Sequence, residues 1–178
     1  MHSRHALWVA LVGGALSMMA AGASAQTTPA APNPLDAIPE KMPFDIPYGT
    51  PIALERAEAA IAAAVAEAKR RDWKMNVAVV DGGGNLVAFQ RMDGAQTASI
   101  QISQHKARAS ATFRRETKAF EASVLGGNNA QLSLDGMIAS RGGIPLVDGG
   151  KLIGAIGCSG GTGSQDEVAC RAGAATIK

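Results

Sequence analysis

The sequence predicts an α+β domain in which helices pack on an antiparallel sheet. Apolar strand-like runs occur in two adjacent pairs, each pair separated by a turn that begins Asp-Gly-Gly. Segments with apolar residues at helical spacing precede, separate and follow these pairs. Strands grouped as hairpins are antiparallel neighbours, so helices must cover the sheet that they form. The order argues against a dinucleotide-binding fold, which is built from repeated βαβ units.

The first 49 residues are predicted to lie outside this domain. A basic start, an apolar run over residues 6–20 and the pattern Ala23-Ser24-Ala25 are typical of a secretory signal peptide over residues 1–25. An uncleaved anchor is the alternative, although the apolar run is short for a membrane span. Residues 26–49 contain six prolines and are expected to form an extended linker. We therefore expect export to the periplasm or outside the cell.

The charge of the chain excludes one class of partner. The formal net charge is +2, and it becomes +1 if Arg4 leaves with the signal peptide. Nucleic-acid-binding domains carry a strong basic excess, so we expect no nucleic-acid partner. Basic residues cluster at 106–118, where a solvated helix face is the default interpretation and an anionic ligand or partner is the alternative.

The domain, residues 50–178, is expected to begin with a helix and a hairpin. Thr50 and Pro51 suit the N-cap and the first helical position of a helix over residues 52–71. Strands over residues 75–93 then flank a turn that runs from Asp81 to Asn85.

The second half repeats this order. Helices are predicted over residues 97–113 and 117–125, followed by a loop or short helical turn up to Arg141. A second hairpin over residues 144–157 turns at Asp148-Gly149-Gly150, and a last helix covers residues 164–178.

A glycine-rich loop between the last strand and the last helix has two interpretations. Its sequence, residues 158–165, contains no lysine, so it is not a nucleotide-binding phosphate loop. Backbone N–H groups at Gly160 and Gly161, just before a helix, suit an anion such as a carboxylate. A tight glycine corner is the alternative. Cys158 and Cys170 flank this region and fit either a disulfide or two small buried residues.

Three blocks of sequence resemble a known family. They are AVVDGGGNLVAFQRMDGA (residues 78–95), KARAS (residues 106–110) and the segment from GGIPLVDGG to CRAG (residues 142–173). Together they resemble the signature of the GlcG/HbpS family of small haem-binding proteins, which also includes a domain of corrinoid adenosyltransferases. The resemblance implies a profilin-like or PAS-like fold with an antiparallel sheet of about five strands, and an oligomeric protein that binds haem.

Haem iron is held by His, Met, Cys or Tyr side chains, which restricts the candidate ligands. His105 is the only histidine outside the predicted signal peptide and is the candidate axial ligand. A surface or core histidine is the alternative interpretation. Met92 is either a second ligand or a core residue.

Charged residues near these candidates are predicted to bind the ligand. Arg91, Lys106 and Arg108 suit haem propionates, and Lys106 falls at the characteristic lysine of the family. An ion pair of Lys106 with Asp81 or Asp93 is the alternative, which would brace the fold. Asp81 is also placed to cap the glycine turn that it begins.

The sequence shows no catalytic constellation. No GxSxG motif accompanies His105, so a Ser-His-Asp hydrolase is not expected. The first hypothesis is therefore an exported haem-binding protein that scavenges, buffers or senses haem. The alternatives are an enzyme that degrades haem or handles small organic acids, and a non-catalytic accessory to a membrane sensor kinase or periplasmic dehydrogenase.

Overall fold

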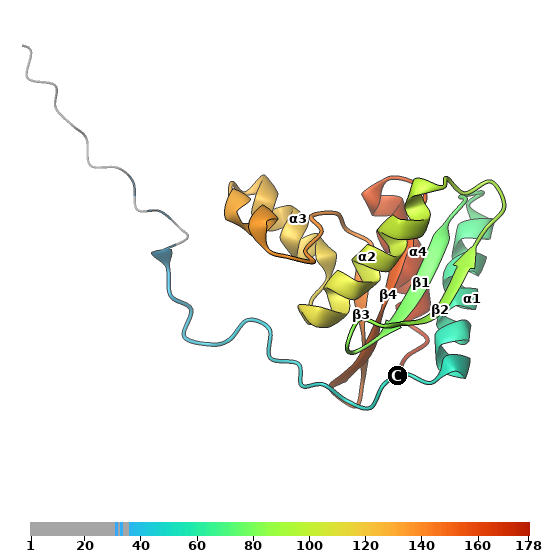
Figure 1. Ribbon diagram of the computed structural model, residues 1–178, viewed down its shortest axis with the longest axis horizontal. Helices are drawn as coiled ribbons and strands as arrows, with labels where there is room; N and C mark the ends of the chain where they lie inside the picture. Colours follow the sequence, from blue (N-terminus) through green and yellow to red (C-terminus); the bar gives the residue numbers. More distant parts are fainter. Residues whose placement is uncertain (1–30, 32, 34–35) are drawn as a thin grey trace, which may run out of the picture. The chain divides into compact units, whose positions relative to one another are not determined.

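The computed structural model describes residues 31, 33 and 36–178, and the predicted signal peptide lies outside these residues. Residues 37–178 form one compact unit. Its elements, shown in Figure 1, are α1 (Leu54–Arg70), β1 (Asn76–Asp81), β2 (Leu86–Arg91), α2 (Ala98–Thr112), α3 (Thr117–Leu125), the 3-10 helix η2 (Asn129–Ser133), β3 (Gly143–Asp148), β4 (Lys151–Ser159) and α4 (Gly163–Ala174).

The four strands form one antiparallel sheet in the order β2-β1-β4-β3. Each predicted hairpin is present, and the long central strand β4 pairs with β1 across the two hairpins. The α+β prediction is confirmed. The described residues hold four strands rather than about five, together with a single parallel bridge between Tyr48 and Leu152.

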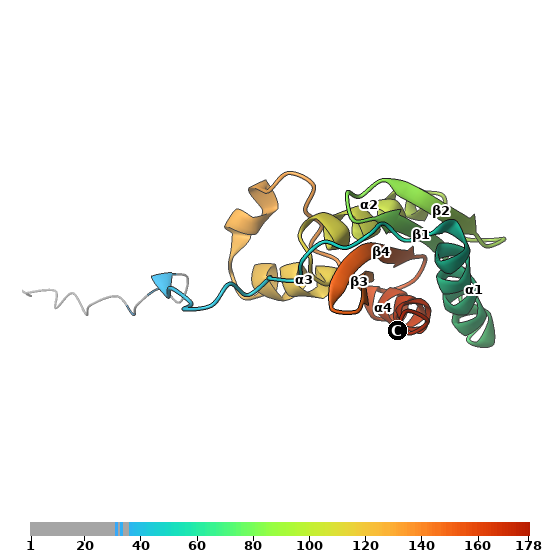
Figure 2. The same ribbon diagram turned by 90° about the horizontal axis from the view of Figure 1, so that it is seen from below.

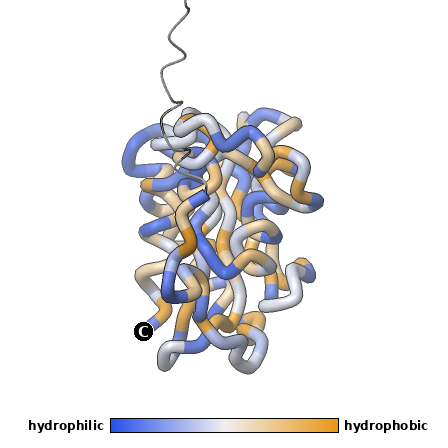
Figure 3. The backbone as a smooth tube through the Cα atoms, turned by 90° about the vertical axis from the view of Figure 1, so that its left-hand side faces the viewer, coloured by the Kyte–Doolittle hydropathy of each residue, from blue (hydrophilic) through white to orange (hydrophobic). Residues whose placement is uncertain are grey.

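Helices cover both faces of the sheet. Helix α2 packs on β1, β3 and β4 from one side, whereas α1 and α4 pack on the other side and against each other (Figure 2). The larger core lies between the sheet and α1 and α4, where Val77, Val79 and Ile156 meet the alanines of α1. In Figure 3, hydrophobic and hydrophilic stretches alternate along the domain, as expected for elements with one inward face.

Glycines allow α2 to lie directly on the sheet. A Cβ atom at Gly157 of β4 would overlap the Ser103 carbonyl oxygen and lie 2.5 Å from the Ala107 backbone nitrogen. A Cβ atom at Gly143 of β3 would likewise overlap the Lys106 carbonyl oxygen. Real Cβ atoms do not approach backbone so closely, so this helix–sheet contact requires glycine at both positions. The close approach brings the side chain of Lys106 to the end of β4.

The last part of the linker lies on the domain. The Arg115 guanidinium carbon lies 3.1 Å from the centre of the Phe44 ring, and Arg114 donates a hydrogen bond to the Ile46 carbonyl at 3.2 Å. The Tyr48 hydroxyl group donates to the Thr112 carbonyl at 3.1 Å. Residues 44–48 are therefore held at the C-terminal end of α2.

The predicted start of the first helix is wrong. Thr50 and Pro51 precede the helix by several residues, and α1 begins at Leu54 with Ala53 as the N-cap. The reason is that this stretch pairs with β4: the N–H groups of Gly49 and Ile52 donate to the carbonyls of Leu152 and Ile153. Backbone that satisfies a sheet edge is extended, so the helix starts only after the pairing ends.

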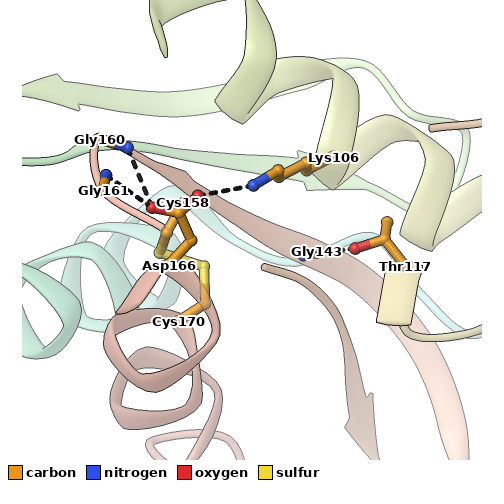
Figure 4. The surroundings of a disulfide bond; sticks show 8 residues. All are labelled: Lys106, Thr117, Gly143, Cys158, Gly160, Gly161, Asp166 and Cys170. Carbon is orange, nitrogen blue, oxygen red and sulfur yellow. Dashed lines mark hydrogen bonds and ion pairs between the residues drawn. A yellow bond between two sulfur atoms is a disulfide. The ribbon is translucent and has the colours of Figure 1, made fainter. Parts of the chain in front are cut away.

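A disulfide joins β4 to α4. Cys158 and Cys170 are bonded, with their Cα atoms 5.6 Å apart, and both are fully buried (Figure 4). The structure thus decides between the two interpretations of the cysteines. None of the helices in the described part of the chain has the length and apolar character of a membrane span.

Candidate functional site

Lys106, one of the predicted site residues, belongs to a buried ion pair. The Lys106 ammonium lies 2.7 Å from the Asp166 carboxylate, and the two side chains are 1% and 3% exposed. Figure 4 shows Lys106 reaching from α2 toward Asp166 on α4, with Gly160 and Gly161 beside the carboxylate. Their N–H groups donate to Asp166 Oδ1 at 3.0 and 3.1 Å. The pair therefore joins α2, the glycine loop and α4.

The alternative partners predicted for Lys106 were wrong. Lys106 pairs with Asp166, not with Asp81 or Asp93, because α2 crosses the end of β4 where α4 begins. Burial raises the pKa of the Asp166 carboxyl, and the Lys106 ammonium and the two N–H groups act in the opposite direction. The structure engages the Lys106 ammonium inside the protein, so it is not free to meet a propionate.

The glycine loop is a corner in this structure. Gly160 must be glycine, because a Cβ atom there would overlap the carbonyl oxygen of Lys74. The N–H groups that could hold an external anion already serve Asp166. Helix α4 then begins with a capping box between Thr162 and Gln165. An anion at Gly160 and Gly161 would have to displace the Asp166 carboxylate.

Asp81 caps the first hairpin turn, which is the structural role that the sequence predicted for it. Its Oδ1 accepts the N–H groups of Gly83 and Asn85, both at 2.9 Å. Burial opposes ionisation, but these hydrogen bonds outweigh it and hold the pKa of the carboxyl below its usual range. Asp81 also lines a cavity of about 400 Å³ with Tyr48, Pro51 and Thr112.

Arg91, Met92 and Asp93 line a separate cavity of about 270 Å³, together with Lys69 and Lys74. Met92 is 8% exposed, and its sulfur accepts the Met75 N–H group at 3.4 Å. This placement fits the core interpretation of Met92. The cavity gathers the cations Lys69, Lys74 and Arg91 beside Asp93.

His105 lies on the outer face of α2, away from the buried pair. Its Nε2 is 3.2 Å from the carbonyl oxygen of Gly136, which belongs to the segment between η2 and β3. The imidazole lines a cavity of about 250 Å³ with Ile102, Arg108 and Gly136, and the glutamines at 101 and 104 complete the lining. Residues three apart on a helix share a face, which places Arg108 beside His105.

The cavity at His105 has a suitable set of groups for a tetrapyrrole edge. It offers one imidazole nitrogen, a guanidinium group and an apolar side chain from Ile102. Both cysteines are in a disulfide and are unavailable as ligands. Among the described residues, no group of three or more His, Cys, Asp and Glu side chains could hold a bare metal ion.

The structure therefore separates the predicted site residues into four places. Lys106, Gly160 and Gly161 meet at the buried pair, Asp81 lies at the turn, residues 91–93 line one cavity and His105 lines another. Sequence reasoning missed Gly136 and Asp166. Asp166 lies 60 residues from Lys106 along the chain, and Gly136 lies in a segment whose sequence carries no strong signal.

A comparison with protein families matches a stretch that lies within the predicted domain. The model of the family described as haem degrading protein HbpS-like matches residues 52–175. Protein GlcG of Escherichia coli strain K12 is 42% identical over 105 residues, covering 59% of this chain and 78% of GlcG.

Solved structures agree with the sequence comparison. A double mutant of HbpS from Streptomyces reticuli superposes with a TM-score of 0.67 at 29% identity, covering 83% of this chain and 99% of HbpS. A PduOC–heme complex superposes with a TM-score of 0.67 at 26% identity, covering 72% of this chain and 96% of the other.

Proposed function

The chain belongs to the HbpS-like family of haem-degrading proteins, and from this premise we propose that it is an exported protein that binds haem or a related tetrapyrrole. A solved relative is described as a heme complex, which supports haem as the ligand class. The observation that carries the proposal is the cavity at His105. It presents an imidazole, a guanidinium and an apolar side chain in one place.

His105 is the residue proposed to ligate the iron. Its ring borders an open cavity, and no other histidine occurs outside the predicted leader. Bound haem would supply an iron centre that binds or activates small molecules. The protein would supply the axial nitrogen and control access to it.

Arg108 is the residue proposed to meet a propionate. It donates one hydrogen bond, from Nε to the Gly84 carbonyl at 3.4 Å. Within the described part of the chain, its other N–H groups have no partner, so the guanidinium can still bind a carboxylate. The cavity of about 250 Å³ is smaller than a typical small-molecule site, so it suits one edge of a macrocycle.

Export and partners are part of the same proposal. A buried disulfide is typical of proteins that fold in an oxidising compartment, which supports export. An oligomer would cover the rest of a macrocycle that one chain holds by its edge. A membrane sensor kinase or a dehydrogenase remains the proposed protein partner.

Haem degradation is a second candidate function, favoured by the description of the family model. To test it, the haem complex is mixed with a reductant in air and the haem absorption is followed over time. Loss of the haem absorption with release of iron would support degradation. A Soret band that persists as it does for haem bound to albumin would contradict it.

Haem titration of the protein without residues 1–25, followed at the Soret band, tests the proposal. We expect a saturable shift with fixed stoichiometry in the wild type and a different band position or weaker binding in His105→Ala. Arg70→Ala is the matched control, because Arg70 is exposed and pairs with Glu67 on the same helix. Absence of a saturable shift would overturn the proposed function.

If the Soret band shifts equally in the wild type and in His105→Ala, haem binds but His105 is not the ligand. Met92→Leu then tests the other candidate predicted from the sequence. Leucine matches methionine in volume, so this change keeps the packing of Met92 while removing its sulfur.

A further inference from the structure

We propose that the hydrogen bond between His105 and Gly136 is a latch on residues 126–141, and that iron binding at His105 Nε2 opens it. The inference rests on the proposed function for its ligand, but the latch itself is a property of the free protein. The two groups come from α2 and from the segment that joins η2 to β3. Ligand binding would thereby change the surface that this segment forms.

The latch and a metal compete for one atom. The Gly136 carbonyl can only accept a hydrogen bond, so His105 Nε2 must carry the proton that makes it. A protonated ring nitrogen has no lone pair for iron. Ligation at Nε2 therefore requires the proton to move to Nδ1, as in the other neutral tautomer, and the hydrogen bond to Gly136 to break.

Nε2 is the ring nitrogen that a macrocycle can reach more easily. Nε2 is the ring nitrogen farther from the backbone, whereas Nδ1 adjoins the carbon that carries the ring. A flat porphyrin that approaches the end of the ring therefore meets Nε2 first. The atom that the haem needs is thus the atom that Gly136 occupies.

Apart from the packing of η2 against α3, the latched segment has few buried contacts. No residue from 126 to 141 is buried, and Leu132 is 60% exposed. Gly127 and Gly136 adopt left-handed backbone with φ of 95° and 77°, and a Cβ atom at either would touch nothing within 4 Å. Segments with few buried contacts open at low free-energy cost.

The C-terminal end of the segment is anchored at Arg141. Opening of the latch would therefore move only the part of the segment that precedes this residue. The Arg141 side chain donates to Glu121 Oε1 at 2.7 Å, and the Arg141 backbone N–H donates to Glu121 Oε2 at 2.8 Å. One atom of the closed segment is buried although its residue is only partly buried: Gln131 Oε1 has no hydrogen-bond partner within the described part of the chain. A buried acceptor without a partner costs free energy, and opening to water would relieve that cost.

Hydrogen–deuterium exchange of residues 126–141 tests the latch in the protein without residues 1–25. In the absence of haem, we expect His105→Ala to raise exchange in this segment several-fold over the wild type. His105→Gln keeps a side-chain N–H donor but cannot ligate iron as imidazole does, so it should exchange more slowly than His105→Ala. Gln101→Ala is the control, because Gln101 lines the same cavity without bonding Gly136.

Hydrogen–deuterium exchange in the presence of saturating ferric haem tests whether haem opens the latch. Wild type should then show raised exchange in this segment, and His105→Gln should show no haem-dependent rise. If haem binds in the Soret titration but exchange in the segment stays unchanged or falls, the latch proposal is overturned and the proposed function stands. If haem does not bind, the proposed function and opening by haem both fail, while unchanged exchange in free His105→Ala overturns the latch itself.

Discussion

Replacing Lys106 by Met is expected to lower the free energy of unfolding by about 3–5 kcal/mol, measured by urea denaturation at neutral pH. Methionine fills a similar volume, so the main effect is to leave the Asp166 carboxylate buried without its cation. Because burial already raises the pKa of this carboxyl, the variant should regain part of its stability as the pH falls and Asp166 takes up a proton.

Two controls separate this effect from a general loss of charge. Lys74→Met removes an exposed ammonium that pairs with Asp72, and exposed pairs contribute at most about 1 kcal/mol. Combining Lys106→Met with Asp166→Asn removes both charges and should restore stability relative to Lys106→Met alone. A loss below about 1 kcal/mol in Lys106→Met would contradict a bracing role for the pair.

Reducing the disulfide is expected to cost about 3 kcal/mol of unfolding free energy, because it closes a short loop between β4 and α4. The measurement compares urea denaturation of the wild type with and without a thiol reductant. Because Cys158 and Cys170 are fully buried, reduction should proceed only as the protein opens, and hence slowly under native conditions.

The double variant Cys158→Ala/Cys170→Ala provides the control for that experiment. It should be less stable than the oxidised wild type, and the reductant should leave its unfolding midpoint unchanged. Equal stability of oxidised and reduced wild type would show that the disulfide does not support the fold. It would also weaken the argument from the disulfide to export.

Local sequence signals predicted most of the fold correctly. Both hairpins follow from Asp-Gly turns between apolar runs, and α2 and α3 lie within a residue of the predicted ranges. The start of α1 did not follow from Thr50 and Pro51, because pairing of this stretch with β4 overrides the local helix signal. Long-range pairing of that kind leaves no trace in a short window of sequence.

The candidate site was less predictable because helical neighbours point in different directions. His105 and Lys106 are adjacent in sequence, yet one lines an outer cavity and the other is buried on the sheet side. The partner of Lys106 lies 60 residues away, so spacing could not identify Asp166. Gly157 and Gly143 were the available signal that a helix lies close to the sheet here. Glycine in a strand often marks the close approach of another backbone.

The most direct test of the account is a pulsed electron paramagnetic resonance measurement on the ferric haem complex, with ¹⁵N introduced only at histidine. In the protein without residues 1–25, His105 is the only histidine, so any ¹⁵N coupling to the iron must come from it. The account predicts a coupling of the size expected for a directly bound nitrogen. A haem complex without that coupling would contradict His105 as the ligand and, with it, the opening of the Gly136 latch by haem.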